Sequence, residues 1–121
     1  MIQKKVENKR VNPRRNLYYY LQVIDIDADN KLGRIADLTT GGMMLISDKQ
    51  FEIGSVVKAR IILDNNLFDM LFSDLDITFT TQWSKPDAKP GHFANGLKFV
   101  DLNDKDLRTI EQIIQKIGFN G

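Results

Sequence analysis

Residues 72–84, "FSDLDITFTTQWS", indicate most directly what kind of fold this chain forms. From residue 75 on, every second position is apolar, aromatic or β-branched and the positions between are polar, which is the period of a strand with one buried face. The residues expected on the buried face are Leu75, Ile77, Phe79, Thr81 and Trp83. The stretch therefore predicts a strand that contributes one row of side chains to a hydrophobic core.

Similar stretches occur on both sides of this one. They predict further strands at residues 17–27, 32–38, 42–47, 55–63 and 92–100, with turn-forming residues at 64–66 and a proline- and glycine-containing loop at 85–91. Six short strands joined by turns favour an antiparallel barrel or sandwich over any arrangement in which strands alternate with helices.

A single helix is predicted near the C-terminus, over about residues 103–117. Asn103 suits the N-cap and Gly118 suits the position just after the last turn. One stripe of the helix is apolar, formed by Leu107, Ile110, Ile113, Ile114 and Ile117. We expect this stripe to seal the mouth or flank of the barrel; the alternative is that it packs against a second copy or another chain.

The composition limits the classes of protein that this chain can belong to. With 121 residues, 42% of them hydrophobic, it can form one core, so a single domain is expected. Cysteine is absent, which excludes disulfides and thiolate metal sites. There is no signal-peptide pattern and no apolar run of the roughly 20 residues that cross a bilayer, so we expect a cytoplasmic protein without membrane insertion.

The charge is distributed unevenly along the chain. Residues 1–15 hold six basic residues and one acidic residue, a net charge of +5, whereas the remainder holds 11 basic and 15 acidic residues, a net charge of −4. We therefore divide the chain into a flexible basic arm, residues 1–16, and a barrel with its C-terminal helix, residues 17–121. A basic arm on a mildly acidic body indicates one anionic partner rather than a nucleic acid bound over a whole face, although a merely solubilising tail is the simpler alternative.

Catalytic machinery is not apparent in the sequence. His92 is the only histidine, and no nucleophile or orienting acid stands near it. The acidic run at residues 25–29 lacks the remaining ligand positions of a calcium-binding loop. We therefore predict a binding module, with no enzymatic activity, no metal and no cofactor.

The basic arm contains "KRVNPRRN", residues 9–16. Arg10 and Arg14 are four residues apart and Pro13 restricts the backbone between them, so a short segment presents two guanidinium groups. Guanidinium groups suit phosphates, the O6 and N7 edge of guanine, and the face of a purine.

A second stretch, "DLTTGG" at residues 37–42, offers complementary groups. The Asp37 carboxylate can accept hydrogen bonds from the N1 and N2 edge of a guanine or orient an arginine. Thr39 can donate a hydrogen bond, and Gly42 either lets a ligand approach the backbone or supplies a positive φ. Together the two stretches suggest an anionic purine ligand.

The order and spacing of these stretches resemble those of the PilZ domain family. The resemblance runs from about residue 8 to residue 118, and it includes "GGMMLIS" after the second motif and "NGLKFVDLNDKDLRTIEQII" near the end. It implies a six-stranded antiparallel β-barrel with a C-terminal helix, acting as a receptor for cyclic di-GMP. The ligand-binding residues that it implies, with Arg15 as an assisting residue, are Arg10, Arg14, Arg15, Asp37, Thr39 and Gly42.

The resemblance also implies how such a receptor works. The basic arm becomes ordered around the ligand, and the new surface recruits or releases a protein partner whose identity the sequence does not specify. One position departs from the family pattern, because Thr39 stands where serine is usual; threonine keeps the hydroxyl but restricts χ1, so we expect retained but weaker binding.

Several alternatives stay open at this point. The chain can be a PilZ-like interaction module that binds no ligand, or, as a less favoured reading, a small β-barrel that binds nucleic acid. One ligand molecule or a pair can occupy the site. Trp83 is expected in the core or at the barrel rim, with a place beside the ligand as the alternative.

Overall fold

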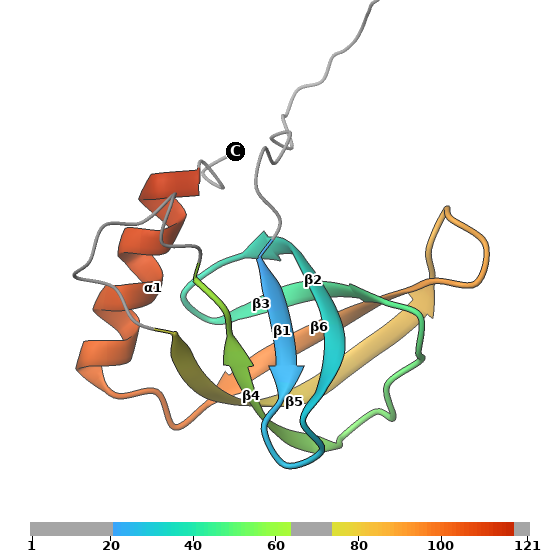
Figure 1. Ribbon diagram of the computed structural model, residues 1–121, viewed down its shortest axis with the longest axis horizontal. Helices are drawn as coiled ribbons and strands as arrows, with labels where there is room; N and C mark the ends of the chain where they lie inside the picture. The colour runs from blue at the N-terminus through green and yellow to red at the C-terminus, as the bar shows by residue number, and fades with distance from the viewer. Residues whose placement is uncertain (1–20, 64–73, 118–121) are drawn as a thin grey trace, which may run out of the picture.

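Six stretches form strands in the computed structural model, which describes residues 21–63 and 74–117. In chain order the strands are β1 (Gln22–Asp25), β2 (Asn30–Leu38), β3 (Gly42–Ser47), β4 (Val56–Ile61), β5 (Leu75–Pro86) and β6 (Phe93–Val100). They pair antiparallel in the order β1-β2-β3-β6-β5-β4, and the β1–β4 pair closes the barrel (Figure 1). The predicted mostly-β fold, a six-stranded antiparallel barrel with a C-terminal helix, is confirmed.

Several strand ends differ from the prediction by one or two residues: β2 begins at Asn30 rather than residue 32, β4 spans Val56–Ile61 rather than residues 55–63, and β6 begins at Phe93 rather than residue 92. Two of the differences have a visible cause or extent. The first strand, expected over residues 17–27, ends at Asp25, because the Asp25 carboxylate accepts hydrogen bonds from the amides of Asp27 and Ala28 and closes a turn. The fifth strand continues into the predicted loop, since Lys85 and Pro86 still pair with β6. Residues 17–20, the turn at 64–66 and the start of the predicted fifth strand at residues 72–73 lie outside the described residues, as does the division of the chain at residue 16.

The helix α1 (Asp104–Ile117) begins one residue after the predicted N-cap. The amide of Asp106 donates a hydrogen bond of 2.8 Å to Asn103 Oδ1, so Asn103 caps the helix as expected. Ile110 and Ile113 are fully buried and belong to the same apolar cluster as the inward side chains of the barrel. Ile110, Ile113 and Ile114 of the predicted stripe therefore pack against the barrel of their own chain.

The barrel core is built from side chains that alternate along the strands. Phe79 lies at its centre, fully buried, and its ring stacks on Phe51 from the β3–β4 connection with centroids 6.2 Å apart. The other fully buried apolar strand residues are Val23, Ile35, Leu38, Leu45, Ala59 and Ile61. No helix within the described residues is long and apolar enough to cross a bilayer.

One buried amide connects β6 to its surroundings. Asn95 is fully buried, and its Oδ1 accepts hydrogen bonds from Ser84 Oγ at 2.6 Å and from the Phe51 amide at 3.2 Å. Its Nδ2 donates to the carbonyls of Leu45 and Lys49 at 3.4 and 3.3 Å. The side chain thus links β3, β5 and the β3–β4 connection to one position of β6.

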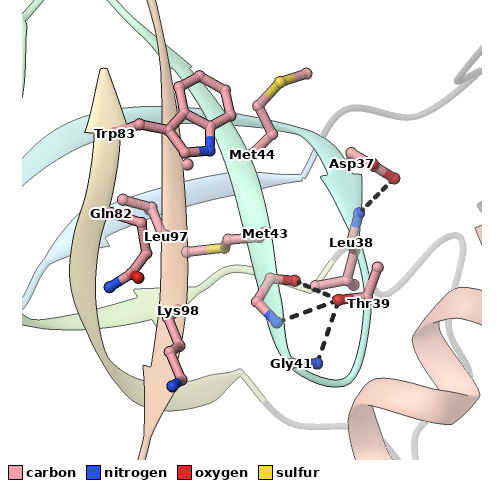
Figure 2. A pocket seen from close by; sticks show the side chains of 12 residues that line it. Asp37, Leu38, Thr39, Gly41, Met43, Met44, Gln82, Trp83, Leu97 and Lys98 are labelled. Atoms are coloured by element: carbon pink, nitrogen blue, oxygen red, sulfur yellow. Dashed lines mark hydrogen bonds between the residues drawn. The ribbon is translucent and has the colours of Figure 1, made fainter.

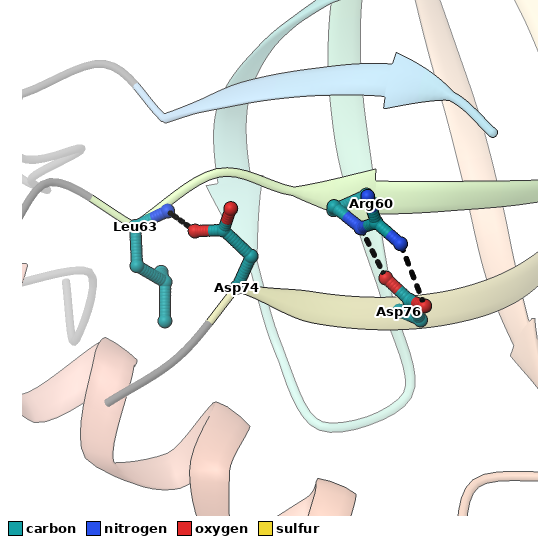
Figure 3. Close-up of polar contacts among 4 residues, drawn as sticks. All are labelled: Arg60, Leu63, Asp74 and Asp76. Carbon is teal, nitrogen blue, oxygen red and sulfur yellow. Dashed lines mark hydrogen bonds and ion pairs between the residues drawn. The ribbon is translucent and has the colours of Figure 1, made fainter. Parts of the chain in front are cut away.

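Polar contacts cover the outer side of β4 and β5 (Figure 3). Arg60 binds Asp76 through two hydrogen bonds of 2.6 and 3.2 Å, and this contact lowers the pKa of the Asp76 carboxyl and raises that of the guanidinium. The Leu63 amide donates to the Asp74 carboxylate at 2.9 Å. Arg60 therefore has an acidic partner on the outer face, which agrees with a solvated strand face rather than an anion site.

Candidate functional site

The candidate site lies on the outer surface of four adjacent strands. In the strand register Asp37 of β2 pairs with Met44 of β3, Met44 pairs with Gly96 of β6, and Gly96 pairs with Trp83 of β5. These four residues form one row across the barrel wall, which we call the outer row. Beside it, Gly42 pairs with Lys98, and Lys98 pairs with Thr80.

Two β-bulges place the ends of the outer row on the outside. In β2 the register shifts between Ile35 and Asp37, and in β5 it shifts between Thr81 and Trp83. Each bulge inserts one residue, which reverses the inward and outward alternation beyond it. Ile35 and Thr81 point toward the core. Without the bulges, strict alternation would turn Asp37 and Trp83 toward the core as well.

The prediction of a core position for Trp83 is therefore wrong. The side chain is 40% exposed and lies outside the barrel, because of the bulge in β5. Gln82, the inserted residue, is also exposed. The strand period alone could not reveal this; the signal available in the sequence was the polar residue Thr81 among inward positions, next to Gln82.

The turn that carries the second motif is held by the Thr39 hydroxyl (Figure 2). Its Oγ1 accepts hydrogen bonds from the amides of Gly41 and Gly42, both at 3.2 Å, and lies 3.3 Å from the Gly42 carbonyl. The Thr39 amide donates to the same carbonyl at 2.9 Å. Thr39 is exposed, so its hydroxyl proton can turn to an outside acceptor while its oxygen keeps the turn closed.

Asp37 stands at the start of this turn and is half-buried. One carboxylate oxygen, Oδ1, accepts the amide of Leu38 at 3.0 Å, which fixes the side chain beside the strand. Among residues 21–63 and 74–117, no hydrogen bond reaches the second oxygen, Oδ2. The carboxylate is thus positioned and keeps acceptor capacity toward the outside.

Gly42 is required by the close approach of two strands. A Cβ built on it would lie 2.0 Å from the Leu97 carbonyl oxygen of β6. Its φ is not among the positive values, which in the described residues occur at Gly33, Gly54, Gly91, Asp29 and Asp101. Of the two roles predicted for this glycine, the positive φ is wrong, and the approach of a ligand to its backbone stays a prediction; the close neighbour in the structure is the backbone of β6.

An open pocket of about 340 Å³ extends over the outer row and the turn. Its lining includes the predicted residues Asp37, Thr39 and Gly42. The prediction from sequence missed several other lining residues, Met44, Gln82, Gly96 and Lys98, and gave Trp83 only as an alternative. Figure 2 shows Trp83 and Met44 on one side of the pocket and Lys98 on another.

The other groups singled out from the sequence do not line this pocket in the part of the chain that the structure describes. His92 is half-buried, and its Nδ1 lies 3.3 Å from the Pro90 carbonyl in the β5–β6 connection. Within residues 21–63 and 74–117 no group of three or more His, Cys, Asp or Glu side chains could hold a metal ion. Arg10, Arg14 and Arg15 lie outside the described residues.

A sequence model of the PilZ domain matches residues 8–116. The chain belongs to the PilZ domain family. The matched range includes the arginine segment, residues 9–16, as well as the turn at residues 37–42 and most of α1. No curated protein matches the chain.

Solved PilZ structures share the fold of this PilZ chain. The Escherichia coli YcgR PilZ domain, solved with c-di-GMP, aligns with a TM-score of 0.59 and 13% identity over 82% of this chain and 81% of its own. The Bacillus subtilis inhibitor of motility MotI/DgrA and the apo state of K. pneumonia MrkH each align with a TM-score of 0.65 and 15% identity over 93% of this chain. This PilZ chain spans 54% of the length of each of those two proteins, so about half of each has no counterpart here.

Proposed function

We propose that this PilZ domain is a receptor for cyclic di-GMP, which binds in the pocket over the outer row and is enclosed by the arginines of residues 9–16. The observation that carries the proposal is the common pocket of Asp37 and Thr39, because these are the groups that the family resemblance assigns to a guanine. The pocket volume of about 340 Å³ falls in the range typical of small-molecule sites.

The arginine segment joins the barrel close to this pocket. The Leu21 carbonyl accepts a hydrogen bond of 2.8 Å from the amide of Ile35, which stands two residues before Asp37. Arg14 precedes Leu21 by seven residues, and a chain of that length spans at most about 25 Å. The arginines are therefore within reach of the pocket without any change in the barrel.

The charges around the pocket suit an anionic purine ligand. Lys98 lines the pocket and Lys85 lies beside Trp83, and both can attract phosphates. The acceptor capacity left on Asp37 suits the N1 and N2 donors of guanine, which adenine does not present. Binding would order the arginine segment and so create the surface that a protein partner reads.

Isothermal titration calorimetry of cyclic di-GMP into the intact protein tests the proposal. We expect saturable binding that is lost in the Arg10→Ala/Arg14→Ala double variant and is not reproduced by GTP or cyclic di-AMP. The stoichiometry distinguishes one bound ligand from a pair. If no heat appears at ligand concentrations well above the micromolar range, the receptor proposal is wrong and a ligand-free interaction module takes its place.

Two further titrations sharpen the result. Thr39→Ser keeps the hydroxyl and removes the methyl group, so we expect it to bind cyclic di-GMP at least as tightly as the natural protein. Long single-stranded DNA or RNA serves as the other ligand: affinity that falls steeply with salt and shows no nucleotide preference would favour a nucleic-acid-binding protein instead.

A further inference from the structure

A second hollow in the outer surface lies over β1, β2 and β3. Its volume is about 390 Å³, slightly more than that of the pocket over the outer row. Three of the side chains that line it can carry a positive charge and only one is acidic, so we call it the basic hollow. The lining residues that matter below are Gln22, Lys31, Arg34, Ile46, Asp48 and His92.

The strand register places this hollow on the outside of the barrel. Gln22 of β1 pairs with Arg34 of β2, and Arg34 pairs with Ile46 of β3. Ile46 is only 7% exposed, yet it is not part of the core cluster, because it alternates with Leu45, which faces inward. Ile46 therefore forms an apolar floor on the outer side, and polar side chains line the hollow around it.

Two of the three basic side chains have polar atoms to spare. Lys31 is exposed and has no acidic partner among residues 21–63 and 74–117. His92 donates from Nδ1 to the Pro90 carbonyl at 3.3 Å, since a carbonyl can only accept, and its Nε2 has no partner in the same part of the chain. Arg34 already takes part in another interaction, so Lys31 is the cation most readily given to a partner.

The mixed lining distinguishes among anionic partners. Asp48 is exposed in the same hollow, and its carboxylate repels phosphates, which offer acceptors and negative charge but no donor. A peptide suits this lining better, because its side-chain carboxylates can pair with Lys31 while its backbone N–H groups donate to Asp48. The Gln22 amide can both donate to and accept from a peptide backbone. An acidic peptide segment therefore fits the hollow better than a phosphate or a nucleic acid.

The basic hollow adjoins both the ligand pocket and the base of the arginine segment. Met44 of the outer row and Ile46 are alternate residues of β3, so their Cα atoms are about 7 Å apart. Gln22 directly follows Leu21, where the arginine segment joins the barrel. When the arginines close over cyclic di-GMP, the chain that leads to them therefore starts at the wall of the basic hollow. Ligand binding in the pocket thus changes the surroundings of the hollow.

We propose that the basic hollow is the docking site for an acidic segment of a partner protein, and that cyclic di-GMP strengthens this docking by fixing the arginine segment beside it. The strengthening rests on the proposed function, whereas the docking itself does not. Since such coupling is reciprocal, the docked segment increases the affinity for cyclic di-GMP by the same factor.

NMR titration of the isotope-labelled intact protein tests the docking with a defined probe, a short peptide in which glutamate alternates with serine and both ends are blocked. We expect saturable shifts of the backbone amides of residues 31–34, 46–48 and 92, and none from a peptide with lysine in place of glutamate. Inorganic phosphate is the second comparison. The same shifts at the same phosphate concentration would indicate a site for a free anion and overturn the assignment to a peptide.

A charge reversal at Lys31 tests the position of the site. Lys31→Glu should weaken binding of the glutamate peptide by about fivefold. Lys58→Glu is the matched control, the same change at an exposed position of β4 outside the lining, and it should leave peptide binding unaltered. Thermal denaturation shows whether both variants fold. Equal weakening by the two variants would mean that only the total charge matters and would overturn the docking site.

Repeating the peptide titration with saturating cyclic di-GMP tests the coupling, and we expect binding at least about fivefold tighter. If the glutamate peptide causes no shifts with or without the ligand, the docking site is wrong, while calorimetry of cyclic di-GMP decides the receptor function separately. If the peptide binds but cyclic di-GMP does not, the receptor function and the coupling are wrong and the docking site stands. Binding of both without any mutual effect overturns the coupling alone.

Discussion

Replacing Asn95 by leucine should destabilise the whole barrel. The amide is fully buried and takes part in four hydrogen bonds, with Ser84, Phe51, Leu45 and Lys49. Leucine has a similar size but neither donates nor accepts, so the Phe51 amide and two carbonyls lose their partner inside the protein. A buried polar group without a partner costs more than the hydrogen bond contributed.

The magnitude follows from the four contacts. The two bonds to Oδ1, at 2.6 and 3.2 Å, are each worth about 1 kcal/mol, and the two longer bonds from Nδ2, at 3.3 and 3.4 Å, are each worth about half of that. The expected loss in the free energy of unfolding is therefore about 3 kcal/mol. A domain of this size has roughly 5–15 kcal/mol in total, so the loss is a large fraction.

Urea denaturation at equilibrium measures this loss directly, provided that the slope of the transition is unchanged. Ser84→Ala removes one of the four bonds and should cost about 1 kcal/mol. Gln112→Leu, the same change of side-chain type at an exposed position of α1, should alter stability by less than about 0.5 kcal/mol. A loss below about 1 kcal/mol for Asn95→Leu would refute the assignment of Asn95 as the polar link between strands.

Three further predictions concern other parts of the chain. Gly42→Ala should lower stability by about 1–3 kcal/mol, since its methyl group meets the Leu97 carbonyl, and thermal denaturation without ligand checks this; an unchanged midpoint would contradict it. Asn103→Ala should cost about 1 kcal/mol through the lost helix cap, measurable by urea denaturation, and a neutral result would mean that solvent replaces the cap. The hydrogen bond from Arg60 lowers the pKa of the Asp76 carboxyl. The contribution of this contact to the stability of the folded protein is therefore fully present above the ordinary pKa of a carboxyl group, and it is lost as the pH falls through the lowered pKa of Asp76. Carboxyl NMR titration should show the midpoint rise in Arg60→Gln, and an unmoved midpoint would exclude the contact in solution.

The sequence predicted the fold well because the barrel follows from a short-range pattern. Short runs of apolar and β-branched residues between turn-forming residues, two of them with a clear period of two, located all six strands, and β3 was predicted with the bounds that it has, residues 42–47. The helix cap at Asn103 and the apolar stripe of α1 are likewise local features that leave a residue-level signal. Such patterns need no knowledge of which strands become neighbours.

Only part of the site could be predicted, because its other residues are brought together by the pairing of strands that are distant in the sequence. Asp37, Thr39 and Gly42 form one short turn, so their proximity is given by their position in the chain. Gly96 and Trp83 join them only through the pairing of β3 with β6 and of β6 with β5, and Trp83 follows Gly42 by 41 positions in the sequence. The bulge in β5 also turns Trp83 to the outer side of the barrel, and the alternation of residues along the strand does not indicate this bulge.

The two bulges imply that this site is encoded by segment length as well as by residue type. Deleting Ala36 would leave every chemical group of the site in the sequence, and deleting Gln82 would remove only one lining residue, yet either deletion would restore strict alternation and turn Asp37 or Trp83 toward the interior. A relative that carries the same motif letters but lacks either inserted residue would thus have a similar barrel and a different outer surface. Inserting or deleting one residue in β2 or β5 can therefore change the outer surface of such a domain while its core is kept. A comparison that considers only substitutions tends to overlook such changes.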